Sequence, residues 1–252
     1  MNILKNKTAV ITGAGSGMGK EMSILFAEEG ANVVACDINS ANLESTVSEI
    51  KAAGNIVTGI TGNISDETDV KKIINNTIAL YGGVDILVNN AGILDDFMTV
   101  NEMKNEMWNK ILSVNLTGPM FACREALHQM LKQGNGVIVN IASVGGLFGA
   151  RGGAAYTVSK HGLIGLTKNI GFTYAKKGIR CNAIAPGAVN TNIGANMHPD
   201  MVGFEALNAG MGINPRTADP SEIATVALFL ASDKSSFING TVVTADGGWT
   251  SY

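Results

Sequence analysis

The chain has 252 residues, of which 46% are hydrophobic and 15% are charged, and its formal net charge is −3 at pH 7. This composition predicts a compact globular protein, and the absence of a basic stripe argues against nucleic acid as a partner. No apolar run approaches the ~20 residues that span a bilayer, and the amino terminus lacks the apolar core of a signal peptide. We therefore expect a cytoplasmic protein with no membrane partner.

Short runs rich in β-branched residues recur along the chain, with room for a helix between them. They predict strands at 8–12, 32–36, 56–60, 86–88, 137–141, 180–184 and 242–244. Helical patterns lie between several of them, at 20–29, 43–53, 70–81 and 154–175. Because several strands are almost continuously apolar, they should be covered on both faces. The pattern predicts an α/β protein, a single-domain doubly wound Rossmann fold over 1–252 whose seven-stranded parallel sheet has helices on both faces.

The first predicted strand runs into a glycine-rich turn, T-G-A-G-S-G-M-G at 12–19, and a helical pattern follows. Glycines let the backbone approach a ligand closely, and a helix amino terminus offers free N–H groups and a positive dipole end to a pyrophosphate. A glycine-rich loop alone is a weak signal, but this position in a strand–turn–helix unit predicts a dinucleotide site. The contacts we expect there come from Gly13, Ser16, Gly17, Met18 and Gly19.

Asp37 follows the second predicted strand, where an acidic residue can bind the adenosine ribose hydroxyls. A carboxylate there also repels the 2′-phosphate of NADP, and the neighbouring Ser16, Ile38 and Asn39 provide no arginine to offset it. We therefore predict NAD (NADH) as the cofactor. Asp37 could also cap the next helix or turn, which does not exclude cofactor binding.

Tyr156 and Lys160 are four residues apart in the predicted helix 154–175, which places them on one face. A nearby positive charge favours the phenolate, so Tyr156 is a candidate proton donor or acceptor. A phenol with a pKa of ~10 needs a shift of roughly 3 units to work at neutral pH, more than one lysine alone should supply. Because such pairs also arise by chance on amphipathic helices, the pair by itself leaves a structural role open.

The stretch 189–217 follows the sixth predicted strand and has no steady period, although it contains Met197, Met201 and Met211. It predicts an irregular lid with short helices, apolar enough to close over a substrate. Elsewhere, Cys36 and the other two cysteines stand singly, and the three histidines form no cluster. We expect buried free thiols and no metal site.

Four separated motifs agree in order and spacing with one known family. They are T-G-x3-G-x-G at 12–19, N-N-A-G at 89–92, the set Asn115, Ser143, Tyr156 and Lys160, and a Pro-Gly pair at 186–187. With these motifs the chain resembles the short-chain dehydrogenase/reductase family over nearly its whole length, from Lys7 to about Gly248.

The resemblance implies an NAD-dependent oxidoreductase acting on CH–OH groups, which interconverts a ketone and a secondary alcohol. Ser143 would hydrogen-bond to the substrate oxygen, and Tyr156 would exchange a proton with it while hydride passes at the nicotinamide C4. Lys160 would hold the nicotinamide ribose and, together with the oxidised ring, lower the pKa of Tyr156. Asn115 would hold a water in the proton route, unless it is an ordinary amide inside a helix.

The resemblance implies further contacts to the cofactor from segments that follow three of the strands. They come from Asn63, Ile64, Asn90, Ala91, Gly92, Pro186, Gly187, Val189 and Thr191. Asn63 departs from the family, which usually has Asp there, so this contact to the adenine is less secure. The expected substrate pocket is mostly apolar and favours a hydrophobic or amphipathic substrate. Its residues are Leu94, Ser143, Leu147, Phe148, Tyr156 and Met197.

Two other functions remain open at this point. One is a 3-oxoacyl thioester (acyl-carrier-protein) reductase, although such relatives usually prefer NADPH and need a basic patch for an acidic carrier. The other is a non-catalytic dinucleotide-binding regulator, against which the complete set of four catalytic residue types argues. The resemblance also implies a homotetramer, with Trp249 and Tyr252 at a subunit boundary.

Overall fold

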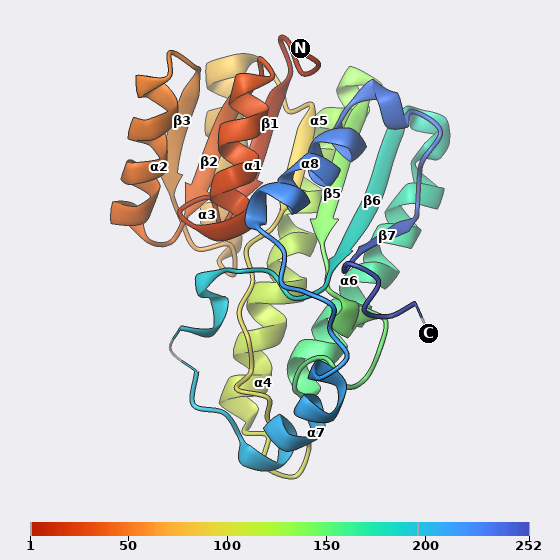
Figure 1. Ribbon diagram of the computed structural model, residues 1–252. Coiled ribbons are helices and arrows are strands. Elements are labelled where there is room, and N and C mark those ends of the chain that lie inside the picture. Colours follow the sequence, from red (N-terminus) through yellow and green to blue (C-terminus); the bar gives the residue numbers. More distant parts are fainter. Residues whose placement is uncertain (1, 196, 252) are drawn as a thin grey trace.

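The computed structural model describes residues 2–195 and 197–251. Its strands form one parallel sheet in the order β3-β2-β1-β4-β5-β6-β7 (Figure 1). The strands are β1 (Thr8–Thr12), β2 (Asn32–Asp37), β3 (Val57–Thr61), β4 (Ile86–Asn89), β5 (Gly136–Ile141), β6 (Ile179–Pro186) and β7 (Val242–Ala245). The order runs outward in both directions from β1 and β4, which confirms the predicted doubly wound Rossmann fold.

Eight α-helices are found among the described residues, and those that pack on the sheet cover both of its faces (Figure 1). On one face, Phe26 of α1 and Ile223 of α8 belong to one apolar cluster with the strands. On the other, Ile73 of α3 and Ala126 of α5 belong to a second. The helices are α1 (Gly17–Glu28), α2 (Ser40–Ala52), α3 (Glu67–Tyr81), α4 (Asn105–Leu112), α5 (Gly118–Gln133), α6 (Ala154–Thr173), α7 (Met201–Met211) and α8 (Pro220–Ala231).

Three helices begin about one turn earlier than the apolar pattern predicts: α1, expected from 20, begins at Gly17, and α2 and α3 follow the same trend. The expected starts were at 43 and 70, whereas α2 begins at Ser40 and α3 at Glu67. Asn39 and Asp66 cap these helices by accepting hydrogen bonds from Asn42 N (3.0 Å) and Thr68 N (2.7 Å). Because polar residues fill a capped first turn, the hydrophobic period starts later than the helix itself.

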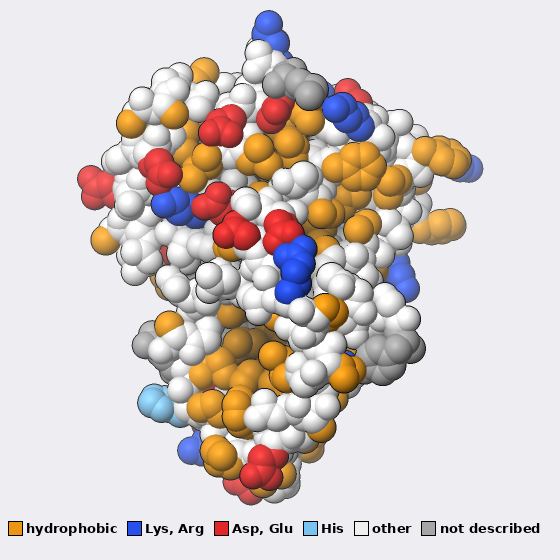
Figure 2. Space-filling model, in the orientation of Figure 1, with side chains coloured by type: hydrophobic (Ala, Val, Ile, Leu, Met, Phe, Trp, Pro, Cys, Tyr) orange, Lys and Arg blue, Asp and Glu red, His pale blue; other side chains and the backbone are white. Residues whose placement is uncertain are grey.

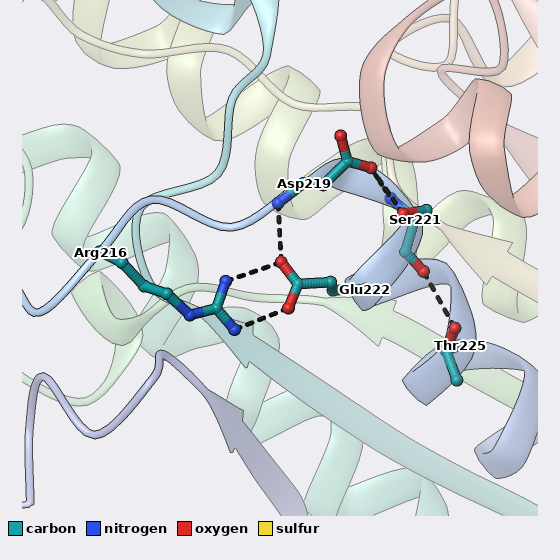
Figure 3. A network of polar contacts seen from close by, with 5 residues as sticks. All are labelled: Arg216, Asp219, Ser221, Glu222 and Thr225. Carbon is teal, nitrogen blue, oxygen red and sulfur yellow. Dashed lines mark hydrogen bonds and ion pairs between the residues drawn. The ribbon is translucent and has the colours of Figure 1, made fainter.

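Between β6 and α8 the chain leaves the sheet and returns to it, over the stretch predicted as a lid. Val189 and Ala218 pair as an isolated parallel bridge that closes the base of this excursion, which includes a 3-10 turn (Asn192–Gly194) and α7. Arg216 binds Glu222 at the start of α8 through two contacts of 2.8 and 2.6 Å, and Glu222 also accepts the Asp219 N–H (Figure 3). These bonds lower the pKa of Glu222 to about 2. They also fix the segment that leads from the lid into α8.

The three cysteines are free and buried, as predicted. Burial raises the pKa of both Cys36 and Cys123 to about 12, so neither thiol is poised to react. Within the described ranges, no helix combines the length and the apolarity that crossing a membrane requires.

Trp249 is only 4% exposed, because it packs within its own chain. Its Nε1 donates to Gly210 O at the end of α7 (2.9 Å), and the Arg151 guanidinium lies 4.5 Å from the centroid of the Trp249 rings. Burial within one chain accounts for this indole without a second subunit. Tyr252, the other residue predicted at a boundary, lies outside the described residues.

Candidate active site

The glycine turn folds tightly against the start of α1. Gly13 and Gly17 have φ angles of +67° and +51°, which other residues rarely adopt. A Cβ on Gly19 would collide with the Gly13 carbonyl oxygen, so this glycine is needed for close packing within the turn. The result is a short turn that leaves the N–H groups at the start of α1 available to a ligand.

A cavity of about 590 Å³ lies beside this turn, at the carboxyl ends of the strands where the strand order reverses. Many predicted cofactor residues line it: Gly13, Ser16, Gly17, Met18, Asp37, Asn63, Ile64, Asn90, Ala91, Gly92 and Thr191. The sequence analysis did not single out several other lining residues as contacts, among them Cys36, Ile38, Lys110, Ser113, Val114, Asn192 and Ile193. The cavity lies in the crevice where doubly wound proteins bind their ligands.

Other predicted cofactor residues have structural roles in this protein and do not line the cavity. Gly187 N donates to Ala245 O (3.0 Å), and a Cβ on Gly187 would lie 2.8 Å from the Cβ of Asp246. Val189 pairs with Ala218 at the base of the lid. Tyr156 and Lys160, which were also predicted to bind the cofactor, do not line the cavity either. All the cofactor contacts, including those from Gly19, Pro186, Gly187 and Val189, stay predictions.

Asp37 holds the glycine turn in place. Its Oδ2 accepts from Gly15 N and its Oδ1 from Asn39 N, both at 2.8 Å. The alternative that Asp37 caps the next helix or turn holds for the turn, through the bond from Asn39 N, but not for the helix, because the cap of α2 is Asn39. Asp37 instead orders the turn before that helix, with its side chain at the wall of the cavity.

The residues around the cavity fit a nicotinamide dinucleotide. Asn90 donates from Nδ2 to Thr12 O (2.9 Å) and Gly13 O (3.2 Å), whereas its Oδ1 is buried and has no hydrogen-bond partner among the described residues. A donor on a ligand in the cavity would satisfy that oxygen. Asn63 directs its Oδ1 to Ser65, from whose N and Oγ it accepts at 3.0 and 2.8 Å, so the amide helps to shape the adenine end predicted for the cavity.

Ser143, Tyr156 and Lys160 lie together at the carboxyl end of β5. They are 9%, 7% and 4% exposed, respectively. The Tyr156 ring and the Ser143 hydroxyl are close together, since a Cβ on Gly145 would lie 3.2 Å from Tyr156 Cε1 and 3.4 Å from Ser143 Oγ. The Ser143 oxygen accepts from Gly145 N at 3.0 Å. Lys160 Nζ donates to Ile141 O at 2.9 Å and lies 5.6 Å from the centroid of the Tyr156 ring. A phenol, a hydroxyl and an ammonium thus share one nearly water-free site.

Burial controls the pKa of both ionisable groups in this set. It raises the pKa of Tyr156, which the hydrogen bond from Ser143 partly opposes and the charge of Asp95 reinforces. It lowers the pKa of Lys160 to about 8. The lysine therefore does not activate the phenol in this structure, and a lowered Tyr156 pKa stays a prediction for the protein with its cofactor bound.

Asn115 lies in a π-helical turn, Ser113–Thr117, between α4 and α5. Its side chain is fully buried and bridges two segments, exchanging hydrogen bonds of 2.9 Å with Ile93 N and Ile93 O and donating to Ser159 Oγ at 3.2 Å. A Cβ on Gly92 would lie 3.4 Å from both Asn115 Oδ1 and Lys160 Nζ. Asn115 therefore lies inside a continuous helical segment, as the alternative of a helix-interior amide has it, and its part in a proton route stays a prediction. π-Turns of this kind are frequent at functional sites.

The structure does not bring all the predicted substrate residues to one pocket. Leu147 and Phe148 line a second cavity of about 540 Å³, together with Thr244 of β7 and Glu222 of α8. Met197 lies in the lid, close to Gly194. Figure 2 shows hydrophobic side chains gathered in a hollow in the lower half of the molecule, in the region of α4, α7 and the lid.

Sequence reasoning missed Asp95, which is fully buried beside Tyr156. Its carboxylate accepts hydrogen bonds from Gly153 N (3.0 Å) and Tyr156 N (2.8 Å), at the start of α6. No motif marked it, because its partners are 58 and 61 residues away. Across the described ranges, no group of three or more His, Cys, Asp or Glu side chains could hold a metal ion.

A doubly wound sheet, a glycine turn at its ligand crevice and a buried Ser-Tyr-Lys set beside that crevice define a nicotinamide dinucleotide-binding oxidoreductase. A family model described as enoyl-(acyl carrier protein) reductase matches residues 13–250. The chain belongs to the short-chain dehydrogenase/reductase family, whose members act on hydroxyl and carbonyl groups.

Relatives and solved structures match along essentially the whole chain. A 3beta-hydroxysteroid dehydrogenase 2 of Eggerthella lenta is 42% identical, covering 99% of this chain and 97% of the relative. A 3-oxoacyl-(acyl-carrier-protein) reductase FabG of Thermotoga maritima is 41% identical, over 97% and 98%. The crystal structure of a levodione reductase matches with a TM-score of 0.90 and 35% identity, covering 98% of this chain and 99% of that one.

Proposed function

We propose that the protein is an NAD(H)-dependent oxidoreductase that interconverts a ketone and a secondary alcohol. The observation that carries this proposal is that Ser143, Tyr156 and Lys160 are buried together beside the dinucleotide cavity, with Lys160 Nζ 5.6 Å from the centroid of the Tyr156 ring. When bound, the nicotinamide would supply or accept a hydride. Ser143 and Tyr156 would orient the substrate oxygen, and Tyr156 would give it a proton or take one from it. Asn115 would keep Lys160 and its surroundings in place.

We propose an apolar, ring-containing substrate. Ile193, Met201 and Val202 of the lid are 44%, 63% and 67% exposed, which leaves apolar surface for a substrate to cover. Phe97, in the loop after β4, lies 6.0 Å from Phe204 of α7, measured between ring centroids, so aromatic side chains join that loop to the lid. The hydroxysteroid dehydrogenase relative is consistent with a large apolar alcohol.

The preference for NAD over NADP rests on Asp37. Replacing it with Ser removes the charge at the cavity wall, so we expect kcat/KM with NAD to fall roughly 10- to 100-fold while the discrimination against NADP weakens. Steady-state kinetics with both cofactors measure the change. Glu44→Gln, which removes an exposed charge from α2, is the matched control and should alter neither value. A parent enzyme that already prefers NADPH would contradict the assignment.

The alternative with direct support is a 3-oxoacyl-(acyl-carrier-protein) reductase, because one relative at 41% identity has that name. Asp37 opposes the NADPH that such enzymes usually use, and the chain has 18 basic against 21 acidic residues to offer an acidic carrier. A panel of hydroxysteroids, cyclic alcohols and 3-oxoacyl thioesters, assayed with NAD(H) and NADP(H), separates the two. We expect NAD-dependent turnover of the cyclic substrates; preferential NADPH-dependent reduction of the thioesters would reverse the choice.

The same substrate panel tests the remaining alternative, a regulatory protein that binds a dinucleotide but catalyses no reaction. Ser143, Tyr156, Lys160 and Asn115 are all present and buried, which favours an enzyme. No oxidation or reduction across the whole panel, together with tight NADH binding, would support the regulator instead.

We propose a homotetramer as the assembly. Phe172 of α6 and Phe237 before β7 are 88% and about 100% exposed in the single chain, as expected of side chains that a second subunit covers. Sedimentation that shows only monomers would contradict this proposal.

A further inference from the structure

Asp95 supplies the cap that α6 lacks. The residue at the N-cap position of this helix is Gly153, which has no side chain to accept the free N–H groups of the first turn. The Asp95 carboxylate, from the loop after β4, accepts from Gly153 N at 3.0 Å and from Tyr156 N at 2.8 Å. It is fully buried. One side chain from a distant segment therefore fixes the turn that carries Tyr156.

The space for this carboxylate is made by the glycine opposite to it. A Cβ on Gly153 would lie 2.6 Å from the Cγ of Asp95, far closer than two such atoms approach. Gly153 has a φ of −72°, which any residue adopts, so backbone conformation does not require a glycine here. Asp95 and Gly153 are thus fitted to one another.

The loop that carries Asp95 is also fixed from its other side. Asp200, at the N-cap of the lid helix α7, donates its N–H to Asp96 O at 2.8 Å. Its carboxylate accepts from Thr99 Oγ1 at 3.1 Å. Asp96 and Phe97 both have positive φ angles, 56° and 57°, which such contacts must stabilise. Asp95 is therefore held between the catalytic helix and the lid.

The negative charge of Asp95 favours the neutral phenol of Tyr156 over the phenolate. A carboxylate close to a phenol disfavours the phenolate, and it raises the pKa of Tyr156. Ser143 lowers that pKa through its hydrogen bond, and Lys160 lies 5.6 Å from the ring centroid on the same helix. The guanidinium of the nearby Arg151 lies against Trp249. Burial raises the pKa of Asp95 itself, and the hydrogen bonds from the N–H groups of Tyr156 and Gly153 at the positive end of the α6 dipole oppose this rise.

We propose that Asp95 is a positioning residue that fixes the first turn of α6 and whose carboxylate, hydrogen-bonded to the Tyr156 N–H, disfavours the phenolate. Its catalytic consequence rests on the proposed function, in which Tyr156 is the proton donor or acceptor; its action on the phenol does not. The enzyme would hold a proton ready for reduction of a carbonyl, and oxidation of an alcohol would become efficient only at higher pH.

Titration of the cofactor-free protein tests the electrostatic part of the proposal. The ultraviolet absorbance of phenolate is followed against pH, and the same titration of Tyr156→Phe identifies the contribution of Tyr156. In Asp95→Asn, Tyr156 should ionise roughly 0.5 to 1 pH unit lower than in the parent protein. Asp66→Asn, which alters the carboxylate cap of α3, is the matched control and should cause no shift. An unchanged Tyr156 titration in Asp95→Asn would overturn the electrostatic role.

The pH dependence of alcohol oxidation gives the catalytic readout. Its alkaline rise should move to lower pH in Asp95→Asn, by the same amount as the phenol titration, whereas a cap with a structural role alone would lower kcat without moving the profile. If the phenol titration shifts but Tyr156→Phe is fully active, the proposed function fails and the action of Asp95 on the phenol stands.

A double-mutant cycle tests the fit between Asp95 and Gly153. Gly153→Ala in the parent protein should lower the midpoint of thermal unfolding by roughly 5 °C, because the new Cβ displaces the carboxylate. In an Asp95→Ala background the same change should cost far less. Gly149→Ala, in the same loop with no atom within 4 Å of a Cβ, is the control for the substitution itself. Equal losses in both backgrounds would overturn the fitted pair.

Discussion

Replacing Tyr156 with Phe should lower kcat by roughly 10³-fold in both directions of the reaction, because the side chain that exchanges a proton with the substrate oxygen loses its hydroxyl. NADH binding should be unchanged, because Tyr156 does not line the dinucleotide cavity. The fold should also persist, because Phe keeps the buried ring and the change removes one hydroxyl with its polar contact to Ser143, a loss of about 1 kcal/mol. Steady-state assays measure kcat, NADH fluorescence titration measures cofactor binding, and thermal unfolding measures stability.

Tyr81→Phe is the matched control for this substitution. The Tyr81 hydroxyl hydrogen-bonds to Thr58 Oγ1 at 2.8 Å, so the variant loses the same kind of contact at a site remote from the cavity. It should keep full activity with a similar small loss of stability. Turnover by Tyr156→Phe within tenfold of the parent would contradict the role of the phenol as proton donor, whatever the control does.

The sheet and the glycine turn were predictable because local patterns encode them. Buried parallel strands require unbroken apolar runs, and all five residues of β1 and all four of β4 are indeed buried. The glycine turn and Asp37 follow consecutive strands, so the chain order itself places them at one edge of the sheet. Strand ends were less predictable, since β6 continues through Pro186, two residues past the predicted end.

Contacts between distant segments could not be predicted in the same way. The carboxylate of Asp95 contacts α6 across 61 residues of chain that include α4, α5 and β5, and no hydrophobic periodicity in the adjacent sequence marks Asp95 as buried. The segment between Ser143 and Tyr156 is irregular, so its apolar residues suggested a substrate pocket, whereas Leu147 and Phe148 line a cavity beside β7 and α8. Residue type predicted their chemistry, but only packing decides which cavity they line.

We expect Lys160→Met to change activity and stability in opposite directions. We expect kcat/KM to fall roughly 10²- to 10³-fold, because the site loses the charge that would hold the cofactor ribose and favour the phenolate. Methionine keeps most of the side-chain volume in a position that is 4% exposed. Lys168→Met, an exposed change on the same helix, is the matched control and should leave activity unaltered.

The same variant should be more stable than the parent at neutral pH. Burial lowers the pKa of Lys160 from 10.5 to about 8, so below pH 8 folding must place an ammonium in a site that disfavours it. In the parent, this burial of a charge costs about 3 kcal/mol of stability. The variant avoids that cost but loses the hydrogen bond to Ile141 O, which is worth about 1 kcal/mol. The variant should therefore gain about 2 kcal/mol at pH 7 in the cofactor-free state.

The difference in stability between the variant and the parent should depend on pH. Between pH 8 and 10.5 the lysine is neutral in the folded protein and still charged in the unfolded chain, so the parent gains stability as pH rises while the variant does not. The variant's advantage in unfolding free energy should shrink across that window and reverse above it, where only the loss of the hydrogen bond to Ile141 O remains, about 1 kcal/mol in favour of the parent. Denaturant unfolding at several pH values measures it. A variant that is less stable at every pH would show that the lysine stabilises the fold, and its retention would then need no catalytic explanation.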